Sequence, residues 1–170
     1  MRAHSASAKR PALPALSLKN SQTRSLAKNK KAFFDYEVLE KFETGIILTG
    51  PEVKSIKAGS VQLKGSFAVV VGSRVFLENM HVSPYRYSVL EGYNPLRKRE
   101  LLLHRKEIEH LSGIYVQKGG TLIPLEIILK NNLIKVLLGV CRGKKSHDKR
   151  NVLKKRAVER DINPELSSPL

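Results

Sequence analysis

TLIPLEIILKNNLIKVLLGVC, residues 121–141, consists of two apolar runs on either side of a short polar turn. Both runs are rich in Ile, Leu and Val, the composition of buried β-strands, and Lys130, Asn131 and Asn132 supply the turn. We therefore predict a β-hairpin with strands over 121–129 and 133–141. Because this hairpin is the clearest local signal in the chain, the rest of the expected fold is built outward from it.

The sequence before this hairpin alternates short β-rich runs with two short helical patterns. Pro51 favours a helix start, Gly59 favours its end, and Gly72-Ser73 has the form of a tight hairpin turn. Six or seven short strands with two or three short helices predict a mainly β fold, a small closed barrel of OB type, which commonly binds oligonucleotides. The elements expected are strands over 34–39 and 44–49, a helix over 51–58, a hairpin over 67–71 and 74–78, a strand over 100–103 and a helix over 105–111 that ends at Gly113.

The 170 residues, 41% of them apolar, suffice for one modest core. A formal net charge of +16 indicates a polyanionic partner. The charge is concentrated at the ends, because residues 1–31 carry eight basic and no acidic side chains, and residues 142–160 carry nine and two. We predict a disordered basic arm over 1–30, a folded body over 31–141 and a basic tail over 142–170, with a marginal helix that forms only on binding.

Motifs for catalysis and metal binding are missing from the sequence. It contains no phosphate-binding glycine loop, no zinc-protease motif and no nucleophile elbow. His104 and His110 are six residues apart and do not share a helix face, and Cys141 alone supports neither a disulfide nor a zinc site. We expect no cofactor, no metal and no enzymatic activity. The apolar runs are too short to span a membrane, so we expect a cytoplasmic, monomeric protein.

Three stretches have the composition of a nucleic-acid interface. Tyrosines alternate with arginines over 79–99, where rings could stack on bases and guanidinium groups could hold phosphates, or the rings could simply pack against the body. Glu43, Glu52 and Lys54 lie near the first helix, where a carboxylate either accepts hydrogen bonds from RNA or is merely solvated. The third stretch, 143–150, is basic and contains His147, although such charge runs are usually only solvated.

Five motifs occur in order along residues 30–160: DY at 35–36, TGPEVKS at 49–55, ENMHVSPY at 78–85, RKRELLLH at 97–104 and GKKSHDKR at 143–150. In sequence, order and spacing they closely resemble the small protein B family, the bacterial partner of transfer-messenger RNA (tmRNA). The resemblance implies an OB-type barrel that binds the tRNA-like domain of tmRNA. It also implies delivery of tmRNA, with elongation factor Tu and GTP, to the decoding region of stalled ribosomes.

The resemblance also implies which residues carry this function. The expected RNA-binding residues of the body combine the family positions with the polar groups of the first helix: Glu43, Glu52, Lys54, Asn79, Tyr85, Leu102, His104 and Lys135. The tail residues expected at the ribosomal decoding centre are Lys144, Lys145, His147, Asp148, Lys149, Arg150, Lys154, Lys155 and Arg156.

Two other functions fit parts of the sequence. A general single-strand-binding OB protein would need a groove of spaced aromatic side chains, yet the chain contains no Trp and only five Phe and five Tyr. An RNA-modifying or RNA-cleaving enzyme would need acid–base groups such as His104 and His147, but no spacing in the sequence assembles them.

Overall fold

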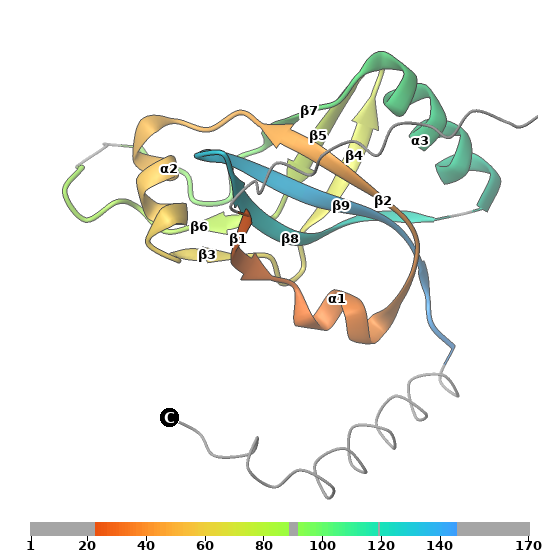
Figure 1. Ribbon diagram of the computed structural model, residues 1–170, viewed down its shortest axis with the longest axis horizontal. Helices are drawn as coiled ribbons and strands as arrows, with labels where there is room; N and C mark the ends of the chain where they lie inside the picture. Colours follow the sequence, from red (N-terminus) through yellow and green to blue (C-terminus); the bar gives the residue numbers. More distant parts are fainter. Residues whose placement is uncertain (1–22, 89–91, 119, 146–170) are drawn as a thin grey trace, which may run out of the picture.

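The structure, a computed structural model, describes residues 23–88, 92–118 and 120–145. Three helices and nine strands follow one another in this part of the chain (Figure 1). In order they are β1 (Thr23–Lys28), α1 (Lys30–Asp35), β2 (Tyr36–Ile46), α2 (Gly50–Lys57), β3 (Val61–Gln62), β4 (Phe67–Val71), β5 (Arg74–Glu78), β6 (His81–Val82), β7 (Arg99–Leu102), α3 (Arg105–Lys118), β8 (Thr121–Lys130) and β9 (Leu133–Gly143).

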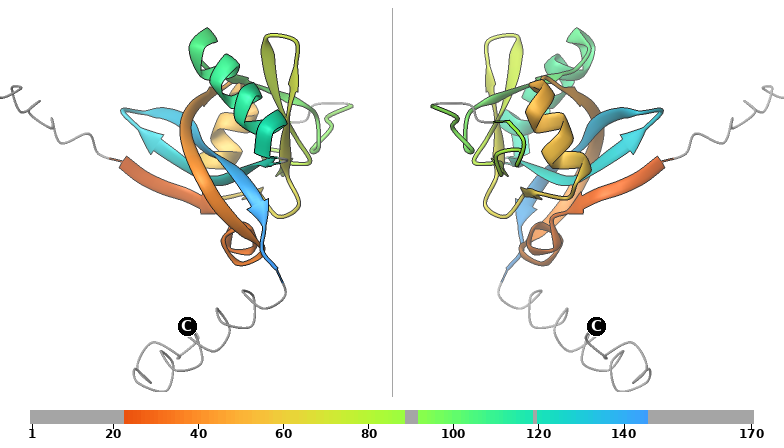
Figure 2. Two further views of the ribbon diagram at one scale, coloured as in Figure 1. Left: turned by 90° about the vertical axis from the view of Figure 1, so that its right-hand side faces the viewer. Right: turned by 90° about the vertical axis from the view of Figure 1, so that its left-hand side faces the viewer.

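Seven of these strands form one antiparallel sheet in the order β1-β8-β4-β5-β7-β2-β9. Because β8 also pairs with β9, the hydrogen-bonded neighbours from β8 through β4, β5, β7, β2 and β9 lead back to β8, as in a ring. β1 lies outside this ring on β8, and β3 and β6 form a separate two-stranded sheet. The fold is therefore mainly β, with α2 and α3 near opposite ends of the body (Figures 1 and 2).

The hydrophobic core lies between the ring of strands and the two longer helices. Ile56 of α2 and Leu111 of α3 are fully buried, as are Leu77 of β5, Leu122 of β8 and Val136 of β9. All five belong to one continuous cluster, so each helix contributes to the same core as the sheet. The apolar runs of the 121–141 hairpin supply much of this core, as their composition predicted.

Both hairpins expected from the sequence are confirmed, with small differences at their ends. β4 and β5 pair around the Gly72-Ser73 turn, where Gly72 has a φ of 60°. β8 and β9 pair from Thr121 and Cys141 to Lys130 and Leu133, and the turn residues Asn131 and Asn132 adopt left-handed conformations that asparagine tolerates. The helix expected over 51–58 is also confirmed as α2, which begins after Thr49 with a capping box from Glu52.

The prediction of two strands over 34–39 and 44–49 was wrong. A single strand, β2, runs through the polar residues between them because β9 pairs with it along nearly its whole length. The helix expected to end at Gly113 was also predicted too short. α3 continues to Lys118, since Ile114 packs on the core beyond the glycine and this burial exceeds the roughly 1 kcal/mol that a helical glycine costs.

The start of the body also differs from the expected boundary near residue 30. Residues 23–28, assigned to the basic arm, form β1 and pair with β8. The strand and α1 are joined through Asn29, a buried N-cap whose Oδ1 accepts a hydrogen bond from Ala32 N at 3.1 Å. Its Nδ2 donates to the carbonyls of Leu63 and Pro124 at 3.0 Å each, which joins this corner to β8 and to the segment after β3. The expected character of residues 1–22 lies outside the described residues.

Asn29→Ala tests this corner. The substitution leaves two carbonyls and one N–H without a partner in a buried position, so we expect a loss of about 3 kcal/mol of unfolding free energy. Urea denaturation followed by circular dichroism measures the loss, with the exposed Ser25→Ala on β1 as the control. A loss below about 1 kcal/mol would mean that water replaces the three hydrogen bonds.

Candidate nucleic-acid interface

Four of the expected RNA-binding residues lie together in one hollow of the surface. Glu43 comes from β2, Leu102 from the end of β7, His104 from the residue before α3, and Lys135 from β9. These side chains are separated by up to 92 positions in the sequence, and the ring of strands brings them to one place. We call this hollow the β2–β7 pocket; its remaining lining residues are Gly45, Leu103 and Glu107.

Two backbone features shape the β2–β7 pocket. Gly45 pairs directly with Leu102, and a Cβ on Gly45 would lie 3.1 Å from the Leu102 Cβ, so a glycine lets the strands approach. Leu102 stays 53% exposed and presents an apolar side chain to the solvent. His104 precedes α3, where its carbonyl accepts from Ile108 N and its N–H donates to Glu107 Oε2 at 2.8 Å, as in a helix cap. These contacts fix the backbone of His104 and leave its side chain exposed.

Glu43 forms ion pairs with two lysines, Lys135 in the pocket lining and Lys130 next to the pocket. Lys130 Nζ lies 2.8 Å from Glu43 Oε2, and Lys135 Nζ lies 2.6 Å from Oε1. Hydrogen bonds from Lys130, and then from Lys135, hold the pKa of Glu43 below its ordinary value. Glu43 therefore keeps two cations side by side at the surface, where they can also contact phosphate groups. The sequence analysis missed Lys130 at the end of β8, Gly45 of β2 and Glu107 of α3, because only the tertiary packing of these elements brings them together at this site.

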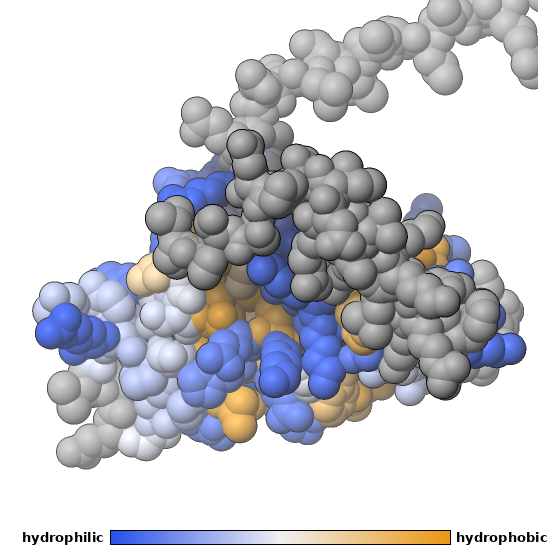
Figure 3. Space-filling view, turned by 90° about the horizontal axis from the view of Figure 1, so that it is seen from below, coloured by the Kyte–Doolittle hydropathy of each residue, from blue (hydrophilic) through white to orange (hydrophobic). Residues whose placement is uncertain are grey.

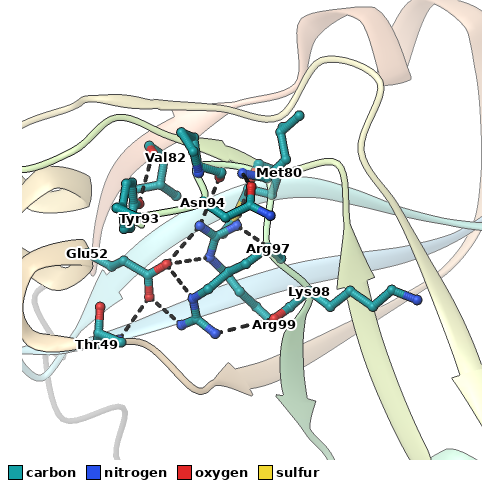
Figure 4. Close-up of polar contacts among 11 residues, drawn as sticks. Thr49, Glu52, Met80, Val82, Tyr93, Asn94, Arg97, Lys98 and Arg99 are labelled. Atoms are coloured by element: carbon teal, nitrogen blue, oxygen red, sulfur yellow. Dashed lines mark hydrogen bonds and ion pairs between the residues drawn. The ribbon is translucent and has the colours of Figure 1, made fainter. Parts of the chain in front are cut away.

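Glu52, by contrast, is not open to a ligand. Its side chain is buried, and its oxygens accept hydrogen bonds from Arg97, from Arg99 and from the backbone N–H of Thr49 (Figure 4). Arg99 Nε and Nη2 lie 3.0 and 2.8 Å from Oε1, and Arg97 Nε lies 2.8 Å from the same oxygen. Glu52 thus belongs to a structural ion-pair network.

The same network changes the interpretation of the arginines over 97–99. Arg99 is fully buried and also donates to the carbonyls of Met80 and Pro95, at 2.6 and 3.0 Å. Its guanidinium group therefore holds protein segments together and is not available for phosphate. Arg97 is directed to the same carboxylate, and of this group only Lys98 is exposed, where it pairs with Glu78 at 2.8 Å.

The pKa of Glu52 reflects these contacts. Burial alone would raise it, but the hydrogen bonds from Arg97, the Thr49 N–H and Arg99 outweigh burial and hold it at about 2, compared with an ordinary value of 4.5. The carboxylate is thus charged throughout the physiological range, and its charge is offset by two guanidinium groups. A buried ion pair of this kind strongly penalises the loss of either partner.

The other expected residues of the body lie apart from this network. Lys54 is exposed on α2, and its Nζ lies 5.2 Å from the centre of the half-buried Tyr85 ring. Asn79 is exposed just after β5 with a φ of 57°, so it has a role in the turn itself. The structure brings Lys54 and Tyr85 together with each other.

The expected tail begins later than residue 142. β9 continues to Gly143, Arg142 pairs with Glu37, and Lys144 donates its N–H to Asp35 O and its Nζ to Phe33 O at 2.9 Å each. Lys145 is exposed. The other expected tail residues, His147, Asp148, Lys149, Arg150, Lys154, Lys155 and Arg156, lie outside the described residues, as does the expected tail helix.

A second group of cations lies on the face that carries α1 and β3. A hollow there is lined by Lys28, Lys30, Lys31 and Lys64. Figure 3 views this side and shows hydrophilic side chains next to small apolar areas. The body therefore has a local basic surface, although its overall charge is close to neutral compared with the two ends of the chain.

Groups that suggested catalysis or metal binding have other environments. Cys141 is buried, and burial raises the pKa of its thiol to about 11, so it is protonated at neutral pH. His110 Nε2 lies 3.0 Å from Glu40 Oε1 at the surface. Within the described ranges, no three His, Cys, Asp or Glu side chains are grouped to hold a metal ion. In the same ranges, no helix is both long and apolar enough to cross a membrane.

Comparison with known proteins gives consistent matches along most of the chain. A family model described as SmpB protein matches residues 26–168. The SsrA-binding protein of Bacillus subtilis (strain 168) is 53% identical over 137 residues, which cover 81% of this chain and 88% of that protein. The SsrA-binding protein of Clostridium perfringens (strain 13 / Type A) is 48% identical over 148 residues, covering 87% and 95%.

One solved structure also matches the fold. It is described as "tmRNA-SmpB: a journey to the center of the bacterial ribosome", and its matching chain is 46% identical to this one, with a TM-score of 0.61. The match covers 81% of this chain and 96% of that chain. Sequence and fold thus point to the same set of relatives.

Glu52→Gln tests the buried network through its pH dependence. The folded-state pKa of Glu52 lies below its unfolded value, so its stabilisation is complete above about pH 5 and declines as the pH falls towards 2. We expect the variant to lose on the order of 3 kcal/mol of unfolding free energy at neutral pH and to lack this acid-dependent component. Urea denaturation at several pH values measures the loss of unfolding free energy and its dependence on pH. The substitution Glu37→Gln, at an exposed glutamate, is the control. Parallel pH curves for Glu52→Gln and the unmutated protein would contradict the assignment.

Proposed function

The chain belongs to the SmpB family, and from this premise we propose that its body binds the tRNA-like domain of tmRNA through the β2–β7 pocket. It is an SsrA-binding protein that acts in trans-translation, and it is a non-catalytic RNA-binding protein. The observation that carries the location of the site is the meeting of Glu43, Leu102, His104 and Lys135 in one hollow.

The chemistry of the pocket suits a folded RNA. Lys130 and Lys135 supply two adjacent cations for phosphates, and the carboxylate between them can accept hydrogen bonds from ribose hydroxyl or base amino groups. Leu102 offers an exposed apolar contact for a base or ribose, and the imidazole ring of His104 can stack on an unpaired base. These groups differ in kind, so together they select a shaped RNA surface better than a uniform basic patch does.

We further infer that the ring of strands is a closed OB-type barrel. Its support is the chain of pairings that returns to β8 through β9 and the core that fills the space between sheet and helices. A general single-strand-binding protein is the less suitable function, because the pocket lining contains no Phe, Tyr or Trp in a stacking row.

The tail supplies the second part of the proposed function. Residues 146–160 carry six basic side chains, and such a segment suits the phosphate-lined decoding region of the small ribosomal subunit. We propose that the body carries tmRNA, to which elongation factor Tu with its GTP binds, and that the tail enters the ribosome when the message is absent. His147 would stack on an exposed base, and the cations that follow would contact phosphates.

Glu43→Ala and His104→Ala test the β2–β7 pocket. Each removes a polar group at the RNA surface, so each should weaken tmRNA binding by about 1–3 kcal/mol without changing the melting temperature substantially. Filter binding with purified tmRNA measures the affinity. Glu37→Ala is the matched control, since Glu37 is also an exposed, ion-paired glutamate on β2 but lies outside the pocket. If both pocket variants bind tmRNA as tightly as the unmutated protein and the Glu37→Ala control do, the site lies elsewhere.

Removal of residues 146–170 tests the tail. This cut leaves β9 and the Lys144 contacts intact, whereas a cut after Cys141 would remove the end of the strand. We expect the shortened chain to bind tmRNA specifically and to fail in peptide tagging on stalled ribosomes in a reconstituted system. Tagging at the normal rate would contradict the role of the tail, and tagging by His147→Ala at the normal rate would contradict only the stacking.

A further inference from the structure

We propose that the turn formed by residues 85–88 is a stacking platform for an unpaired RNA nucleotide, separate from the β2–β7 pocket. Tyr87 supplies the ring on which the base stacks, and Lys54 and Arg86 supply the cations for the adjoining phosphates. The inference rests on the proposed RNA-binding function, which it extends to a second contact surface.

The local geometry presents these side chains outward. Ser88 N donates to Tyr85 O at 3.0 Å, which closes a β-turn with Arg86 and Tyr87 at its two central positions. Side chains at these positions point away from the body, and Tyr87 is accordingly 79% exposed. It is the most exposed large hydrophobic side chain of the described residues.

The ring of Tyr85 contacts that of Tyr87. The two rings are 5.6 Å apart at an angle of 64°, an edge-to-face arrangement that is favourable for aromatic pairs. Lys54 Nζ lies 5.2 Å from the Tyr85 ring centre, so Tyr85 already has a cation as its partner. The ring left available for a base is therefore that of Tyr87.

Hydrogen bonds hold the loop that carries this turn on both sides, before the turn and after it. On one side Ser83 N donates to Ser60 O at 3.0 Å, and Val82 N donates to Pro95 O at 3.1 Å. On the other side Tyr93 Oη donates to Val82 O at 2.9 Å, and Arg99 is fixed by Glu52. A stacking ring on an anchored turn loses less conformational entropy on binding than one on a free loop, which is the physical advantage of this arrangement.

Helix α2 contributes both to the hydrogen bonds that hold the loop and to the stacking platform. Glu52 faces the interior and binds Arg97 and Arg99, whereas Lys54, two residues later, is exposed and lies over Tyr85. Residues two apart on a helix point to different faces, so one short helix holds the loop and supplies its cation. The buried ion pairs thereby hold Met80 and Pro95, which lie before and after the loop that carries the platform.

The platform lies at a different place from the β2–β7 pocket. The loop that follows β6 lies beside α2 at one end of the body, and α3 is near the other end (Figure 1). The β2–β7 pocket lies next to the start of α3. A folded RNA, or two RNAs, can thus contact both surfaces at once. The shared ligand chemistry is an unpaired base with its phosphates, and its source is either tmRNA or ribosomal RNA.

Tyr87→Ala and Tyr87→Phe in the full chain test the platform. The probe is a short unstructured oligoadenylate carrying one 2-aminopurine, whose fluorescence is quenched when the base stacks on a ring. We expect Tyr87→Ala to lose the quenching and roughly 5- to 100-fold in affinity, and Tyr87→Phe to behave like the unmutated protein. Tyr115→Ala, which removes another exposed tyrosine on α3, is the matched control and should change neither.

Two further binding reactions identify the source of the base. Weaker binding of Tyr87→Ala to purified tmRNA assigns the base to tmRNA, and weaker binding to vacant ribosomes alone assigns it to ribosomal RNA. Full quenching by Tyr87→Ala, equal losses in the Ala and Phe variants, or unchanged binding to both natural RNAs would overturn the proposal. Failure of the unmutated protein to bind tmRNA would instead overturn the proposed function.

Discussion

The buried carboxylate of Glu52 is the interaction on which the arrangement of one whole end of the molecule depends. Two arginines and a backbone N–H bind its two oxygens, and Arg99 extends the network to Met80 and Pro95. α2, the segment around β6, the loop before β7 and β7 itself are therefore fixed to one another by a single charge. Among the described residues, no buried side-chain polar atom is left without a partner, which is the condition for tolerating buried charge.

The second constraint is the closure of the sheet through β8. This strand pairs with β9 along its length, with β1 beside it and with β4 near its start. Closure fixes the register of β9 against β2, where Glu43 faces Leu137 and Gly45 faces Lys135. The pocket exists only in this register, because a shift by one residue would turn Lys135 to the other face.

Much of the fold and part of the site could be predicted from the sequence. The two hairpins and α2 were predicted because their signals are local: β-branched and aliphatic runs, tight turns and a capped helix start. The single strand β2, the strand β1 and the length of α3 were missed, because pairing with β8 or β9 and packing on the core outweigh local preferences there. The arginines over 97–99 were interpreted as phosphate contacts, since a basic run does not reveal that a carboxylate 45 positions earlier lies against it.

The sequence by itself determined what kind of partner this protein takes and which family it resembles. Charge, composition and ordered motifs are properties of the chain that need no coordinates, so they indicated an RNA-binding protein directly. The tertiary structure alone decided which charged groups remain free for that partner. Glu43 and Glu52 were both expected to bind RNA, yet Glu43 is exposed between two lysines and Glu52 is buried between two arginines. The physical reason is burial, which depends on every element that packs against a side chain and not on the residue or its neighbours in sequence.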